Sequence, residues 1–154
     1  MKKLVVLLLL FFLAVRPVGA AEYALPYPGI LPDSPVYFLK NLRDQTVLFF
    51  LRDKTQKSFY LLLMSDKRLG AGQVLVNTGK ISLGEITLVK SEDYFKQAVD
   101  LADKNNKDLI SKLVVAGSKH QEILEGLRSK AAIEKTYSNA QKDFIRVTEM
   151  LMIK

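Results

Sequence analysis

The sequence predicts an all-α protein, a small antiparallel bundle of four to five helices over residues 35–154 that follows a proline-rich leader. Two observations predict this class. Apolar residues recur at intervals of three and four along most of this region, which is the period of a helix that packs on one face. No segment shows the sustained apolar–polar alternation, or a two-residue turn such as Asn-Gly, that indicates strands and hairpins.

The first twenty residues have the three parts of a secretory signal peptide. Lys2 and Lys3 precede an apolar run from Leu4 to Val15, and small residues follow at positions 18–21. As a helix the run would rise roughly 18 Å, against about 30 Å of bilayer hydrocarbon. We therefore predict a signal peptide over residues 1–20 and an exported protein: periplasmic, extracellular or on the cell surface. The alternative is an uncleaved segment that anchors the chain in the cytoplasmic membrane.

Composition excludes several classes of function. The chain has no cysteine, which excludes thiol catalysis, cysteine-ligated zinc and iron–sulfur clusters. Its net charge is +7, but removal of Lys2, Lys3 and Arg16 with the signal peptide takes Lys plus Arg from 23 to 20, against 16 acidic residues. The mature charge is therefore near +4. Export and the lack of a basic block interleaved with aromatic residues argue against nucleic-acid binding.

A proline-rich extended leader is predicted over residues 21–34. Its closely spaced prolines favour extended backbone and prevent a continuous helix. The leader is a spacer between the membrane and the folded domain, or a docking strip that uses Tyr23 and Tyr27.

The helical domain is predicted to open with two helices. Ser34 as N-cap and Pro35 at the first helical position begin a helix that runs to Leu51 with a thick apolar face. A second helix is predicted over residues 55–77, with Gly79 as its C-terminal stop.

Glycines inside the second helix and a capping box after it carry the next predictions. Gly70 and Gly72 weaken a helix, so we expect them to permit a close crossing with a neighbour. Ser82 and Glu85 have the spacing of a capping box, which predicts that the third helix begins at Ser82 and runs to about Ala102.

The last two helices are predicted to form a coiled-coil-like hairpin. After a polar turn at residues 103–107, two apolar stripes have heptad spacing, and a turn at residues 129–132 folds them antiparallel. Phe144 then faces Gly117, and His120 faces Ala140. The stripes are Ile110, Leu113, Gly117, His120, Leu124 and Leu127, and then Ile133, Tyr137, Ala140, Phe144, Val147 and Leu151.

No catalytic, cofactor-binding or metal-binding residue is predicted, and no cofactor is expected. His120 is the single histidine, so metal sites that need two histidines cannot be built. Its place on an apolar seam indicates a core histidine rather than a catalytic base. The acid pairs Glu92–Asp93 and Glu122–Glu125 are interpreted as parts of solvated helix faces.

Three segments together show a family resemblance. Residues 31–40, LPDSPVYFLK, resemble the L-P-x-S-P-x-Y-x-L-K opening of a bacterial helical family described as domain of unknown function 5667. Residues 67–79 resemble its R-L-x-E-A helix ending in glycine, although Ala71-Gly72-Gln73 replaces the usual acidic residues. Residues 119–124 resemble its K-H-x-x-x-L segment. The resemblance implies an exported or membrane-tethered helical protein, in a family some of whose members accompany regulators of envelope signalling. It supplies no activity.

Together these observations predict a non-enzymatic interaction or regulatory module of the cell envelope, whose partner is an unknown protein or envelope component. Peripheral or anchored association with the membrane is compatible with the sequence, and the oligomeric state stays open. The alternative is a structural envelope protein that self-associates through apolar residues outside the seams, such as Leu61, Met64 and Ile145. An enzyme is the third hypothesis.

Overall fold

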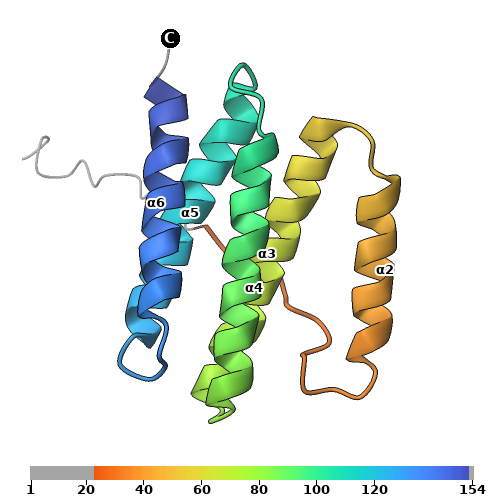
Figure 1. Cartoon of the computed structure of the whole chain (residues 1–154), viewed down its shortest axis with the longest axis vertical. Coiled ribbons are helices and arrows are strands. Elements are labelled where there is room, and N and C mark those ends of the chain that lie inside the picture. Colours follow the sequence, from red (N-terminus) through yellow and green to blue (C-terminus); the bar gives the residue numbers. More distant parts are fainter. Residues whose placement is uncertain (1–22, 153–154) are drawn as a thin grey trace, which may run out of the picture.

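Five helices form the part of the chain that the computed structural model describes, residues 23–152 (Figure 1). The predicted signal peptide, residues 1–20, lies outside the described residues. Between residues 23 and 152 there is no strand, so the predicted all-α class is confirmed. The helices are α2 (Tyr37–Phe50), α3 (Lys54–Asn77), α4 (Ile81–Leu101), α5 (Lys107–Leu127) and α6 (Glu134–Met152).

The helices α3, α4, α5 and α6 run alternately up and down and make the bundle, whereas α2 lies at its margin beside α3 (Figure 1). Short connections join each helix to the next, as expected of antiparallel neighbours. None of these five helices combines the length and the apolar character that crossing a bilayer requires.

The α3–α4 pair is the most closely packed, because small residues meet along it. The Ser65 hydroxyl donates to the Ser91 carbonyl and the Ser91 hydroxyl to the Ser65 carbonyl, both at 2.9 Å. A methyl group at Gly72 would lie 2.6 Å from the Leu88 side chain, so the predicted close crossing at Gly72 is confirmed. The small residues recur every seven positions and pair as Ser58 with Ala98, Ser65 with Ser91, and Gly72 with Gly84.

The predicted start of the first helix is wrong by two residues. α2 begins at Tyr37, and Val36 stands at the N-cap without a side-chain hydrogen bond. The Ser34 amide donates to the Leu31 carbonyl and the Tyr37 amide to the Ser34 carbonyl, both at 3.0 Å. The chain around Pro35 therefore satisfies its backbone groups in turns, and Ser34 does not act as the cap.

The predicted capping box is also wrong, whereas the stop before it is confirmed. Gly79 has a φ of +83°, the left-handed conformation that ends α3. Helix α4 begins at once at Ile81, so Ser82 lies inside it. Glu85 instead accepts a hydrogen bond from the Ala132 amide at 2.6 Å, in the connection between α5 and α6. Glu85 therefore binds a residue that is distant in sequence instead of capping its own helix.

The predicted hairpin of the last two helices is confirmed. α5 and α6 pack against each other around a turn that ends at Ile133. Phe144 of α6 fills the notch at Gly117, and Phe95 of α4 reaches the same notch. The predicted polar turn is present over residues 103–106, and Lys107 already begins α5, with Asn106 as its N-cap.

Replacing Gly117 with alanine should destabilise the bundle by about 1–3 kcal/mol, because the new methyl group would lie 2.9 Å from Phe144 and 3.0 Å from Phe95. Gly126 of the same helix has nothing within 4 Å of a methyl group, so Gly126→Ala is a matched control. It should be neutral or stabilising by up to about 1 kcal/mol. Urea unfolding measures both, and equal effects of the two substitutions would show that the notch at Gly117 is not tightly packed.

Candidate functional site

A histidine held between two carboxylates lies at the centre of the bundle. His120 of α5 is fully buried, and its Nε2 lies 3.0 Å from Asp66 Oδ1 of α3. Its Nδ1 lies 2.8 Å from Glu92 Oε1 of α4. Asp66 and Glu92 are themselves 3% and 5% exposed. The three side chains therefore form one polar contact among three helices, away from solvent.

This polar layer separates two apolar clusters, one towards each end of the bundle. In α3, Asp66 lies between Leu62 of one cluster and Leu69 of the other, and Glu92 and His120 have equivalent places in their helices. The first cluster consists of Leu61, Leu62, Phe95, Ala98, Val99, Leu109, Ile110, Leu113, Ala116 and Val147. The second consists of Leu69, Val76, Leu88, Ile123, Leu124, Leu127, Ile133 and Ala140.

The surroundings of His120 favour the charged form of its imidazole. Burial by itself would lower its pKa, but the charge of Glu92 and the hydrogen bonds to Asp66 and Glu92 outweigh burial and raise the pKa to about 9. The geometry agrees, because only an imidazolium can donate a hydrogen bond from both ring nitrogens to two carboxylates. The Phe95 ring lies against one side of the imidazole, with centroids 5.0 Å apart.

The leader contacts the polar layer from the outside of the bundle. The Tyr23 hydroxyl donates to Asp66 Oδ2 at 2.5 Å, and burial together with this bond raises the pKa of Tyr23 well above its usual range. Leu25 packs against the second apolar cluster and, with Pro28, faces Gly70. Tyr27, by contrast, is 83% exposed. Residues 23–28 are therefore attached to the bundle, and the interpretation of the leader as a free spacer is wrong for this part.

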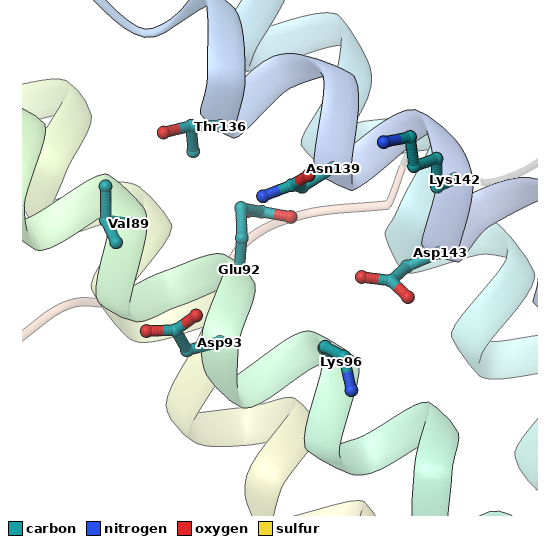
Figure 2. A pocket seen from close by; sticks show the side chains of 8 residues that line it. All are labelled: Val89, Glu92, Asp93, Lys96, Thr136, Asn139, Lys142 and Asp143. Atoms are coloured by element: carbon teal, nitrogen blue, oxygen red, sulfur yellow. The ribbon is translucent and has the colours of Figure 1, made fainter.

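On the α6 side, the layer borders a pocket between α4 and α6 (Figure 2). Glu92 extends from α4 towards Asn139 and Asp143 of α6, and its Oε2 has no hydrogen-bond partner. Burial raises the pKa of Asp143, although Arg146 and Lys96 act to lower it. The pocket has a volume of about 210 Å³ and is lined by Val89, Glu92, Asp93, Lys96, Thr136, Asn139, Lys142 and Asp143.

The arrangement suits a structural role better than proton transfer to a substrate. Both nitrogens of His120 are occupied by carboxylates, and the ring has no exposed surface. The hydroxyl nearest to Glu92 in sequence is that of Ser91. It donates a hydrogen bond to the Ser65 carbonyl. Within residues 23–152, no group of three or more histidine or carboxylate side chains is placed to hold a metal ion.

The acid pairs noted in the sequence differ in their burial. Glu122 and Glu125 are exposed and pair with Lys119 and Arg128, as a solvated face requires. For Glu92 the same interpretation is wrong, since its carboxylate is buried against His120.

Sequence reasoning missed Asp66 altogether, although the spacing carried a clue. Leu62, Asp66 and Leu69 are spaced by four and then three, and so are Leu88, Glu92 and Phe95. Each carboxylate thus occupies a position where an apolar stripe would place a core residue.

We predict that the free energy of unfolding decreases as the pH rises from about 6.5 to 9. The pKa of His120 is higher in the folded chain than the ordinary value of 6.5. Its stabilising contribution is therefore complete below pH 6.5 and is lost as the pH rises through about 9. The decrease should be on the order of 3 kcal/mol. Urea unfolding at a series of pH values measures it.

Glu92→Gln should lower the pKa of His120, because the variant keeps the shape of the side chain but removes its charge, so the decrease should be smaller and should end at a lower pH. Glu122→Gln is the matched control, since Glu122 is an exposed glutamate near His120 in sequence. It should leave the pH profile unchanged. Coincident profiles for the wild-type chain and Glu92→Gln would contradict the assignment of the decrease to His120.

Comparison with known proteins gives a family and no activity. Searches against curated proteins and against solved structures found no match. The family model described as Domain of unknown function (DUF5667) matches residues 29–154, from within the leader to the end of the chain. This range contains all five helices and the three central side chains Asp66, Glu92 and His120. The chain therefore belongs to the DUF5667 family.

Proposed function

We propose that this chain is an exported, non-enzymatic interaction module of the cell envelope, and that it contacts its partner through the outward side of α2. The observation that supports this is that α2 exposes its large apolar side chains and buries a charged residue. Phe38, Leu39, Leu42, Phe49 and Phe50, which we call the α2 face, are 54–82% exposed. The one fully buried residue of this helix is an aspartate, Asp44.

Polar contacts hold α2 against the leader and the bundle. Lys40 Nζ donates to the carbonyls of Pro28 and Ile30 at 2.5 and 3.1 Å. Arg68 Nη2 donates to Asn41 Oδ1, and Gln45 Nε2 donates to the Tyr94 hydroxyl, both at 3.1 Å. Leu48 is the residue of α2 that packs against the first apolar cluster. A helix attached in this way leaves its large apolar side chains available to a partner.

The sealed environment of His120 supports the non-enzymatic part of the proposal. A catalytic base needs hydrogen-bond access to the proton that it removes, and the His120 ring has carboxylates on both nitrogens. The export part rests on the sequence of residues 1–20 alone.

The second candidate function is self-association as a structural envelope protein. The α2 face favours it as well, because two copies could cover each other's phenylalanines. Of the residues first considered for this role, Leu61 and Met64 are 1% and 3% exposed and belong to the interior. Ile145 is 57% exposed. Any self-association would therefore use α2 rather than Leu61 or Met64.

A photo-reactive residue in place of Phe49 should cross-link the chain to an envelope component in living cells. Phe49 is 82% exposed, so the substitution should leave stability within about 0.5 kcal/mol of the original. Ile145 is the matched control, an exposed apolar residue on α6. Cross-linking no stronger at position 49 than at position 145 would contradict the proposal. A product with twice the mass of the chain would favour self-association.

Export predicts the intact mass of the protein in fractionated native cells. A chain beginning at Ala21 or Glu22 is the expected result, whether it is released or bound to membranes. A mass that retains residue 1 or 2, found only with membranes, would contradict cleavage and identify residues 4–15 as an anchor.

A further inference from the structure

We propose that the α2 face binds the surface of a lipid bilayer that contains anionic lipids. This inference rests on the proposed function and names the partner of the same surface. It requires two features in one place, an apolar area large enough to enter the boundary between headgroups and acyl chains, and positive charge around it.

The apolar requirement is met along one side of the helix. At 3.6 residues per turn, the five side chains of the α2 face fall within an arc of about 120°. Taking about 200 Å² for each phenylalanine, the exposed fractions of Phe38, Phe49 and Phe50 leave roughly 400 Å² uncovered. That is an area comparable with the largest apolar patches of monomeric proteins. Phe49 and Phe50 meet edge to face at the end of α2.

The required positive charge lies at the C-terminal end of α2, where Phe49 and Phe50 also lie. Arg52 and Lys54 are exposed in and beside the connection from α2 to α3, next to the two phenylalanines. The carboxylate between them, Asp53, accepts a hydrogen bond from the Gln56 amide at 2.8 Å and caps α3. Arg43 is exposed beside the α2 face, and its partner Asp44 is buried. Arg52, Asp53 and Lys54 together give this end of α2 a net charge of +1, with a basic residue on each side of the capping carboxylate.

Charge also distinguishes a bilayer from two other possible partners of the α2 face, a second copy of the chain and an anionic envelope polymer. A second copy could cover the phenylalanines, but residues 38–54 offer Arg52 and Lys54 only one exposed carboxylate, Asp53, which already caps α3. A purely anionic envelope polymer would pair with the basic residues but would leave the phenylalanines in water. An anionic bilayer satisfies both the apolar face and its basic margin.

The sequence that precedes the described residues is consistent with this partner. As the predicted signal peptide, the apolar run of residues 4–15 would direct the chain to the membrane whether it is cleaved or kept. Were it kept, it would tether the domain and raise the effective concentration of bilayer around α2.

Phe49→Trp tests the inference directly, because the chain contains no other tryptophan. With the full-length chain and vesicles of phosphatidylcholine plus phosphatidylglycerol, we expect the tryptophan emission to shift to the blue. Brominated acyl chains should quench it. With phosphatidylcholine alone both effects should be much weaker. The probe reports on α2 itself, and a probe elsewhere on the same full-length chain separates docking of α2 from tethering by residues 4–15.

Ile145→Trp is the matched control, since α6 lies at the opposite margin of the bundle from α2 (Figure 1). Its emission should stay unquenched. Equal quenching at positions 49 and 145 would mean non-specific insertion and would overturn the inference.

Removing the basic margin should weaken docking. In the Phe49→Trp background, Arg52→Gln with Lys54→Gln should reduce the docking equilibrium roughly 25-fold, about fivefold for each charge. Lys130→Gln with Lys135→Gln, near the connection of α5 to α6 at the other end of the bundle, removes the same charge and should have little effect. Equal losses in the two double variants would overturn the role given to Arg52 and Lys54.

The two proposals fail in different ways. No quenching at position 49 overturns the bilayer inference, while cross-linking from position 49 to a protein would leave the interaction module standing. Light scattering that shows a mass rising with concentration, abolished by Phe49→Ser, would assign the α2 face to a second copy. No cross-linking above the control at position 49 would overturn both.

Discussion

The buried contact of His120 with Asp66 and Glu92 is the constraint on which the bundle depends. It joins α3, α4 and α5 at one level and leaves an apolar cluster on each side. Removing one partner of a buried ion pair leaves an uncompensated charge, which typically costs 3–5 kcal/mol. The register of three helices is therefore fixed by directional hydrogen bonds as well as by packing.

The charged centre and the α2 face lie on different helices, and we propose that the first stabilises the bundle and the second contacts a partner. The contacts around His120 complete the interior of α3 to α6, and Tyr23 ties the leader to the same layer. The bundle thus has little need of α2 for its core, and α2 is joined to it largely through polar side chains such as Asn41 and Gln45. Because α2 contributes little to the core, it can expose phenylalanines that a core helix would bury.

Much of the fold follows from the sequence, because it is encoded locally. The heptad stripes of the last two helices predict their pairing down to Phe144 at Gly117, and Gly79 predicts the end of α3. The central site does not follow so directly. A carboxylate on a helix is normally solvated, and only its tertiary partners reveal that Glu92 is buried. The start of α4 was mispredicted for a related reason, since Glu85 binds Ala132 rather than its own helix terminus.

A nitrogen-15 NMR titration of the imidazole tests the charged centre most directly, and its signals are unambiguous because His120 is the single histidine. We expect both ring nitrogens to carry protons at neutral pH and the ring to titrate near pH 9. A neutral ring with one protonated nitrogen at pH 7, titrating at or below 6.5, would contradict the charged centre. It would return His120 to the candidates for a catalytic base.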